Sequence, residues 1–206
     1  MIVSLSGIDG SGKTTQAQYV TNLLQREGQG VLYIHMIQWT LVNRLGRLIQ
    51  GANMVPAQTG KTPQNSGKFT LMRQLVSLLD IVHFNLFAAY QANVRHRIIV
   101  CDRFFYDLGI QALYSGTMHP SFEHIYWRLI PASSISILLD LPPDIAQQRE
   151  GEHPLAYYQA KRDLYLKYAP LWRATVVNAT EVESTQKSIS QILKNYFGDK
   201  QRETFR

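Results

Sequence analysis

The feature that most constrains this chain is a glycine-rich segment near its start, Gly7–Thr14, which reads Gly-Ile-Asp-Gly-Ser-Gly-Lys-Thr. The segment matches the pattern G-x-x-x-x-G-K-[ST] at every fixed position. The apolar run Ile2–Ser6 precedes it, and apolar residues follow at helical spacing, at Ala17, Val20 and Leu24. A strand, a glycine turn and a helix in this order predict a loop that binds the phosphates of a nucleotide.

Each part of this loop has a physical role in binding a nucleoside triphosphate. Glycines allow backbone N–H groups to turn inward, and the start of the following helix adds partial positive charge. The Lys13 ammonium suits the outer phosphates, and the Thr14 hydroxyl suits Mg²⁺. We therefore expect ATP with Mg²⁺ as the cofactor, bound by Gly7, Ile8, Asp9, Gly10, Ser11, Gly12, Lys13, Thr14 and Thr15.

A magnesium site needs a carboxylate near the loop, and two aspartates follow apolar runs that are typical of buried strands. Asp102 follows Ile98–Cys101, and Asp140 follows Ile135–Leu139. We favour Asp102 because the next residue, Arg103, places an anion ligand beside the metal. Asp140 is instead followed by Leu-Pro-Pro, which reads as a structural turn. The predicted metal ligands are Thr14 and Asp102.

Phosphoryl transfer depends on positioning and on positive charge near the transferred group. Arg149, on the helix that follows the Ile135 strand, is the first candidate for an arginine that closes over the phosphates. Lys161 and Arg162 are second candidates, and we expect these two to lie on a solvent-exposed helix face. The predicted catalytic residues are Lys13, Asp102, Arg103 and Arg149.

Apolar runs that suit strands alternate with segments of helical spacing along the chain. Strands are expected at Ile2–Ser6, Val31–Ile37, Arg97–Cys101, Ile135–Leu141 and Thr175–Val177. Helices are expected after Lys13, from Pro143, and at Leu71–Val94, Ser121–Leu129, Tyr157–Leu171 and Glu183–Phe197. This alternation predicts a three-layer α/β fold with a parallel sheet covered on both faces, whose ligands bind at the carboxyl ends of the strands.

The 206 residues are enough for one domain, 1–206, with little left for a second. Residues 50–70 contain several glycines and prolines among polar side chains, so we expect a flexible loop there. A short lid is expected at 150–156, and a frayed tail at 198–206.

Composition limits the partners that this chain can have. Hydrophobic residues make up 45% and charged residues 17%, which is typical of a folded, soluble protein. The net charge of +6 suits anionic partners, but the basic residues are spread out and no nucleic-acid motif occurs, so we expect small nucleotides and no nucleic acid. The single cysteine, Cys101, lies in an apolar run and is expected in the core.

The sequence also bears on membrane association and location. The start of the chain lacks the features of a signal peptide. The longest apolar segment, Leu75–Val94, is interrupted by Asp80, His83, Asn85 and Gln91, so it is interpreted as a core helix and not as a membrane span. We therefore expect a cytoplasmic protein with no membrane partner.

Together these motifs resemble the thymidylate kinase family of nucleoside monophosphate kinases. Four segments carry the resemblance, and their order covers nearly the whole chain: Gly7–Gln16, Cys101–Phe104, Leu139–Asp144 with Gln148 and Arg149, and Asn178–Thr180. The resemblance implies a P-loop NTPase fold with five parallel strands, a homodimer, and transfer of the γ-phosphoryl group of ATP to a nucleoside monophosphate, with thymidylate as the first candidate.

The resemblance also implies roles for particular residues. Asp9 is expected near the acceptor sugar, and the Asp102–Arg103 pair near the acceptor phosphate and the metal. Arg149 matches the start of the family's lid. Asn178, Ala179 and Thr180 match the turn near adenine, so they complete the predicted ATP site.

Three segments depart from the family pattern around the acceptor. His35–Trp39 stands where the family has a turn like Arg-Glu-Pro-Gly, and Asp80-Ile81 stands where the family has Asp-Arg. Arg73, two helical turns before Asp80, is the candidate to replace that arginine, so the predicted acceptor ligands are Asp9, Arg73 and Arg103. The expected lid, at Glu150–Pro154, contains no arginine.

These departures keep alternative functions open. A kinase of the same fold that acts on a nucleoside or a sugar-like metabolite is the first alternative. A nucleotide-binding switch without an acceptor is the second, although the guanine-reading motif Asn-Lys-x-Asp is absent.

Overall fold

The protein contains one sheet of five parallel strands. A computed structural model describes the backbone of residues 1–40 and 67–204, and the side chains of residues 1–40 and 74–198. The strands are β1 (Ile2–Gly7), β2 (Val31–His35), β3 (Ile98–Asp102), β4 (Ile135–Asp140) and β5 (Thr175–Asn178), in the order β2-β3-β1-β4-β5. Every neighbouring pair is parallel, so the predicted α/β class with a parallel five-stranded sheet is confirmed.

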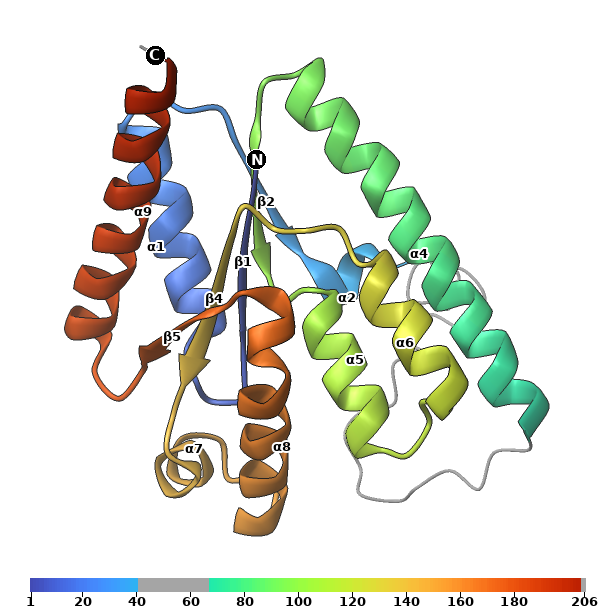
Figure 1. Ribbon diagram of the computed structural model, residues 1–206. Coiled ribbons are helices and arrows are strands. Elements are labelled where there is room, and N and C mark those ends of the chain that lie inside the picture. Colours follow the sequence, from blue (N-terminus) through green and yellow to red (C-terminus); the bar gives the residue numbers. More distant parts are fainter. Residues whose placement is uncertain (41–66, 205–206) are drawn as a thin grey trace.

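Helices cover both faces of this sheet (Figure 1). On one face α1 (Lys13–Arg26) packs against α9 (Val182–Thr204). On the other face α4 (Gly67–Asn93) contacts β3, and α5 (Phe105–Tyr114) contacts β1. Helix α4 also contacts α6, and α5 also contacts α8. The remaining helices are α2 (Met36–Trp39), α6 (Pro120–Leu129), α7 (Pro143–Glu150), α8 (Leu155–Tyr168) and the short 3₁₀ helix η1 (Ala169–Trp172).

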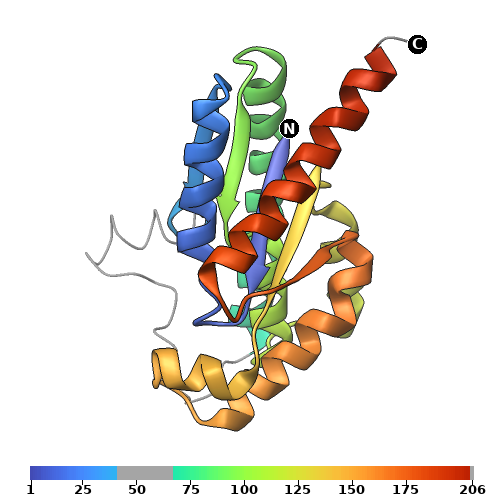
Figure 2. The ribbon, with the colours of Figure 1, turned by 90° about the vertical axis from the view of Figure 1, so that its left-hand side faces the viewer.

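The strand register gathers the polar ends of the strands at one edge of the sheet. Asp102 is paired with Leu5 on one side and His35 on the other, and Asp140 is paired with Asn178. The chain order reverses around the central strand β1, which is where ligands bind in open α/β sheets. Helix α7 lies beyond this end of β4, whereas both termini lie at the opposite end of the molecule (Figures 1 and 2).

Several elements begin or end at other residues than the pattern predicts. Strands β3 and β5 each include the polar residue that was expected just after them, Asp102 and Asn178. Helix α5 was not predicted. Its start lies in an aromatic cluster in which Phe104 and Phe105 meet edge to face, so burial on several sides hides the helical period.

The predicted loop and the predicted tail are both partly helical. Residues 50–66 of the expected loop lie outside the described residues, but α4 begins at Gly67, so 67–70 are helix. Helix α9 continues to Thr204, well past Phe197, where it was expected to end. The backbone of residues 198–204 is therefore helical, and the Lys, Gln, Arg and Glu residues there are good helix formers. A frayed tail from 198 stays a prediction.

Helix α4 is buried on one face only. Ile81, Phe84 and Ala88 lie in the core, whereas the opposite face exposes Leu75, Leu79, Val82, Leu86 and Tyr90, which we call the exposed α4 face. The window Gln74–Asn93 is only 28% buried, and by length and composition alone it could cross a membrane. The interpretation as a core helix therefore holds for one face of α4 only, because the exposed α4 face is not covered by the described residues.

Candidate active site

The glycine-rich loop joins β1 directly to α1, as the pattern predicts. Gly10 and Gly12 adopt φ angles of 81° and 82°, which L side chains rarely adopt. The Ser11 N–H donates to the Ile8 carbonyl at 3.2 Å and closes the turn, and the Gln16 N–H donates to the Gly12 carbonyl at 2.9 Å as the helix begins. The free N–H groups at this helix start are the groups that bind phosphate in such loops.

Lys13 lies inside this loop without a carboxylate partner. Its ammonium is buried and donates to the carbonyl oxygens of Gly7 at 2.9 Å and Ile8 at 2.7 Å. Among the described residues no carboxylate lies within ion-pair distance of it. Burial, helped by the charge of Arg103, lowers the pKa of Lys13 to about 7. A bound anion would remove that penalty, since buried charges are stable when they are paired.

A second group in the loop also lacks a partner. The Ser11 hydroxyl is buried and has no hydrogen-bond partner within the described part of the chain. Buried polar atoms normally have partners, so an orphaned hydroxyl needs an explanation. Its place in the loop makes a phosphate oxygen the natural partner.

The two predicted metal ligands lie next to each other. The Thr14 hydroxyl donates to Asp102 Oδ2 at 2.7 Å, and the Tyr33 hydroxyl donates to the same oxygen at 2.8 Å. Asp102 Oδ1 is buried and has no hydrogen-bond partner in 1–40 and 74–198. Mg²⁺ is a hard cation that prefers oxygen ligands, so a carboxylate with an unused oxygen beside a threonine hydroxyl fits it well.

Asp140, the competing carboxylate, is occupied elsewhere. Arg162 donates to its two oxygens from Nε at 2.6 Å and from a terminal nitrogen at 2.8 Å. The Asp140 carbonyl also accepts from the Ala179 N–H at 2.8 Å, which fixes the start of the predicted adenine turn. This bidentate pair joins β4 to α8 and supports the choice of Asp102 over Asp140 for the metal.

Asp9 is the centre of a buried ionic cluster that joins three segments. Its Oδ1 accepts from Arg103 at 2.8 Å, and its Oδ2 accepts from the Tyr157 hydroxyl at 2.9 Å and from Lys161 Nζ at 3.3 Å. Burial would raise the pKa of Asp9, but Lys161, Lys13 and Arg103 together hold it well below its usual range. Asp9 is therefore ionised, and the predicted acceptor ligands Asp9 and Arg103 are in direct contact.

Lys161 was expected on a solvent-exposed helix face, and that expectation is wrong. Lys161 is only 2% exposed, and its ammonium lies 3.0 Å from the hydroxyl of Tyr157, which is one helical turn earlier on α8. The cause is the position of α8, which packs against α5 and α7 and turns this face towards the glycine-rich loop. Arg162, its neighbour, is partly exposed but paired with Asp140.

Asp107 is a second buried carboxylate that the sequence did not single out. It accepts hydrogen bonds from the Ser6 hydroxyl at 2.7 Å and from the Phe104 N–H at 2.8 Å. It also accepts from the Tyr165 hydroxyl at 2.7 Å and, at 3.4 Å, from the Gly7 N–H. One side chain thus connects the start of the phosphate loop, the segment after β3, and α8.

Arg149 connects two of the predicted ATP-binding segments. It donates to the Gly10 carbonyl at 3.2 Å, to the Ala179 carbonyl at 3.4 Å and to the Thr180 carbonyl at 2.6 Å. Within the turn, Asn178 Oδ1 accepts from the Thr180 N–H at 2.9 Å, which fixes the backbone there. The arginine side chain therefore lies at the loop, where the sequence placed it.

Three positions on the expected acceptor side can be compared with the sequence. Arg73 lies on α4, but its side chain lies outside the described residues. Ile81, where the resemblance would put an arginine, is fully buried in the core. The segment expected as a lid, 150–156, overlaps both helices, because α7 ends at Glu150 and α8 begins at Leu155.

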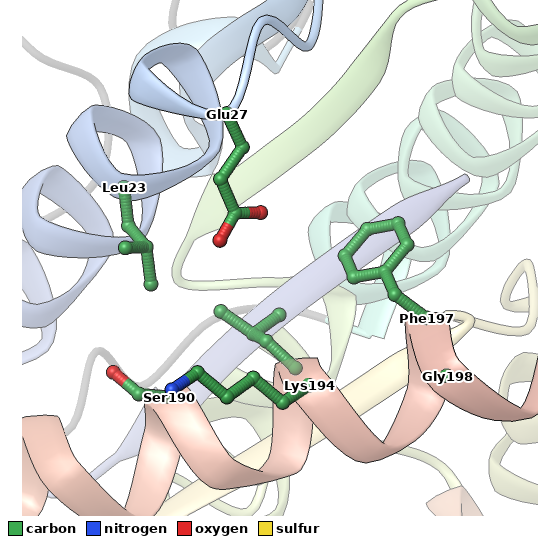
Figure 3. Close-up of a pocket in the computed structure, with 7 residues that line it drawn as sticks. Leu23, Glu27, Ser190, Lys194, Phe197 and Gly198 are labelled. Carbon is green, nitrogen blue, oxygen red and sulfur yellow. The ribbon is translucent and has the colours of Figure 1, made fainter.

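A separate cavity of about 240 Å³ lies between α1 and α9 (Figure 3). It is lined by Leu23 of α1, by Glu27 directly after α1, and by Ser190, Lys194 and Phe197 of α9. Leu23 is about 15 Å along the helix from Lys13, at 1.5 Å per residue. No residue of the predicted site lines this cavity.

The chain is similar over nearly its whole length to archaeal proteins that are each named probable thymidylate kinase. It is 28% identical to the protein of Methanothermobacter thermautotrophicus over 204 residues, which cover 96% of each chain. It is 27% identical to that of Methanosphaera stadtmanae, over 94% of this chain and 98% of the other. It is 21% identical to that of Archaeoglobus fulgidus, over 95% of this chain and 96% of the other.

No family model matches the chain. The likeness to these relatives nevertheless extends well beyond the four short motifs and includes the segments between them. It confirms the resemblance that the motifs indicate: over nearly its whole length, this chain is similar to the thymidylate kinase family.

Proposed function

We propose that this protein is an ATP-dependent kinase that transfers the γ-phosphoryl group of ATP to thymidylate and forms thymidine diphosphate. The observation that carries this proposal is the buried Lys13 ammonium at a helix start, which donates to two loop carbonyl oxygens and has no carboxylate partner among the described residues. The names of the relatives support thymidylate as the acceptor. We also propose that the enzyme is cytoplasmic, that it acts on small nucleotides, and that it binds neither nucleic acid nor a membrane.

The residues divide the work between the two substrates. Lys13, Ser11 and the loop N–H groups hold the donor phosphates, and Arg149 with the turn Asn178–Thr180 lies where the rest of ATP would bind. Thr14 and Asp102 would hold Mg²⁺, which would neutralise charge on the phosphates. Arg103 and Asp9 face the acceptor side, so positive charge lies on both sides of the transferred group.

The proposal is tested by product analysis with a panel of acceptors. Purified protein is incubated with ATP, Mg²⁺ and, separately, thymidylate, other nucleoside monophosphates, thymidine and simple sugars. We expect thymidine diphosphate and ADP in equal amounts with thymidylate. Phosphorylation of thymidine alone would show a nucleoside kinase instead, and nucleotide binding without any phosphorylated product would show a switch protein.

Replacing Arg103 should weaken the acceptor more than ATP. In Arg103→Ala we expect the KM for thymidylate to rise about 10- to 100-fold, because a charged ligand of a bound phosphate is typically worth a few kcal/mol. The KM for ATP should change by less than about threefold, since Lys13 and the loop are untouched. An unchanged acceptor KM would contradict this role of Arg103.

A matched control for Arg103→Ala is present in the chain. Arg103 has a φ of 62°, so alanine there is mildly strained. Arg173 is exposed, has a φ of 51° and lies outside the site. Arg173→Ala should therefore show the same backbone cost without any change in either KM.

We further propose that the exposed α4 face joins two copies of this chain in a homodimer. The resemblance implies a homodimer, and Leu75, Leu79, Leu86 and their neighbours recur at helical spacing with no charged residue among them. The buried side of α4, with Ile81 and Phe84, holds the helix within the domain. A second copy would cover this face without moving α4 from the core.

Charge on this face should separate the copies. In Leu79→Glu with Leu86→Glu we expect sedimentation as a monomer, whereas the unmodified protein should sediment as a dimer. Both side chains are at least 60% exposed, so the fold should persist. Leu171→Glu, equally exposed at 65% but remote from α4, is the control. A dimer that survives the double change would contradict the proposed interface.

A further inference from the structure

Lys161 is a buried cation that has no part in binding ATP, the metal or the acceptor in the proposed function. It lies on α8, outside all four motifs, and only 2% of it is exposed. Burial lowers its pKa, while Asp9 acts in the opposite direction. Burying an ammonium costs free energy unless it is paired and hydrogen-bonded. The partners of Lys161 therefore indicate what this buried lysine does.

The contacts of Lys161 all lead to Asp9. Its ammonium lies 3.3 Å from Asp9 Oδ2 and 3.0 Å from the Tyr157 hydroxyl, and that hydroxyl donates to the same Asp9 oxygen at 2.9 Å. Tyr157 and Lys161 are one helical turn apart, so one face of α8 presents both donors. They contact Oδ2 of Asp9, whereas Arg103 contacts Oδ1.

Arg103 depends on that second oxygen. Asp9 Oδ1 accepts from its guanidinium at 2.8 Å, and no other carboxylate forms an ion pair with Arg103 in the described part of the chain. Its backbone is also unusual, with a φ of 62°. The Arg103 guanidinium is therefore held through Asp9, and Tyr157 and Lys161 help to hold the Asp9 carboxylate in place.

The acceptor side lacks an arginine at two places where the resemblance would put one. Ile81 replaces the arginine that the resemblance would place on α4, and it is fully buried. Between α7 and α8, residues 151–154 contain no arginine either. Arg103 is the predicted acceptor cation whose side chain lies within the described residues, so its orientation bears directly on acceptor binding.

We propose that Lys161 is a positioning residue for the acceptor: together with Tyr157 it holds the Asp9 carboxylate, which in turn directs Arg103 at the acceptor phosphate. This inference rests on the proposed function and names the device that orients its acceptor site. It assigns a function to a residue outside the phosphate loop and outside the Asp102–Arg103 motif.

The test compares Lys161→Met, Lys161→Arg and Tyr157→Phe with the unmodified protein. Lys161→Met keeps the length of the side chain but removes its charge. We expect it to raise the KM for thymidylate about 10- to 100-fold with little change in the KM for ATP, as small misplacements of a binding group commonly do. Lys161→Arg should restore most of the acceptor affinity, and Tyr157→Phe should show a smaller loss in the same direction.

Binding of thymidylate and thymidine separates positioning from a purely structural effect. If Lys161 acts through Arg103, Lys161→Met should lose much more affinity for thymidylate than for thymidine in calorimetry, since only thymidylate carries the phosphate that Arg103 contacts. Equal losses for both ligands, or an unchanged affinity for thymidylate, would overturn the proposal. Lys167→Met, an exposed lysine on the same helix, is the control, and thermal denaturation identifies any variant that fails to fold.

The outcomes also separate this inference from the proposed function. An unmodified protein that phosphorylates thymidylate, with Lys161→Met behaving identically, would overturn the inference and leave the function in place. An unmodified protein that neither binds nor phosphorylates thymidylate would overturn both.

Discussion

Replacing Lys13 with alanine should leave a folded protein that has lost nearly all phosphoryl transfer. Among the described residues the ammonium donates to two carbonyl oxygens, of Gly7 and Ile8, and forms no ion pair, so its removal breaks none there. Alanine suits the first position of α1, which begins at residue 13. Loss of a charge that acts on the transferring phosphate typically costs about 10²–10³ in rate, or roughly 3–4 kcal/mol.

The measurement is ADP release in the presence of thymidylate, together with thermal denaturation of both proteins. The exposed residue Lys187 on α9 supplies the control, and Lys187→Ala should keep full activity. Isothermal calorimetry with ATP and Mg²⁺ should show weaker binding in Lys13→Ala. Activity close to that of the unmodified protein would exclude the loop as the donor site.

The sequence predicts well those parts of the site that arise from local order along the chain. The loop from Gly7 to Thr14 needs only a strand, glycines and a helix start, all of which are adjacent in sequence. The placement of Asp102 beside Thr14 follows from one further rule, that the carboxyl ends of parallel strands meet at the same edge. Arg149 lies at Gly10 for the same reason, because α7 starts at that edge.

The missed residues depend on contacts between distant segments. Lys161 and Asp9 are separated by most of the chain, and the approach of α8 to the loop is set by packing of whole helices. A lysine on a helix with other charged residues nearby is usually solvent-exposed, so its type alone favoured the wrong interpretation. The one available signal was the spacing of Tyr157 and Lys161, which places two polar groups on one helix face.

Helix α4 is a second case in which the sequence does not show what packs against an element. Its apolar residues predict a buried helix, but they extend around more of the surface than one sheet can cover. Ile81 and Phe84 are fully buried, while Leu75 and Leu86 are 62% and 69% exposed. Hydrophobicity along a helix therefore indicates that a face will be covered, and does not say whether the same chain or a second copy covers it.

Removing the Asp107 carboxylate should have the largest effect on stability of any single change in the site. Asp107→Ala leaves the Ser6 hydroxyl, the Phe104 N–H and the Tyr165 hydroxyl without their acceptor. An unsatisfied buried donor costs about 1–3 kcal/mol, so the total loss should be roughly 3–5 kcal/mol. For a domain of this size, that corresponds to a fall in Tm of about 6–20 °C.

Two companion variants show whether these hydrogen bonds act as one network. Asp107→Asn keeps an acceptor oxygen, so it should lose less than half as much stability as Asp107→Ala. Tyr165→Phe removes one donor, and in combination with Asp107→Ala it should add less than its own effect, because the two residues share one interaction. Asp163→Ala, an exposed aspartate on α8, should change the free energy of unfolding by less than about 0.5 kcal/mol.

Activity should follow the same ranking as stability, for a structural reason. Asp107 holds Ser6 and Gly7, where the phosphate loop begins, and it holds Phe104, the residue after Arg103. A folded Asp107→Ala protein, assayed well below its Tm, should therefore show a lower kcat and a higher KM for both substrates. This distinguishes it from Lys161→Met, which acts on the acceptor alone. A variant that loses stability but keeps all kinetic constants would show that Asp107 supports the fold without orienting the loop.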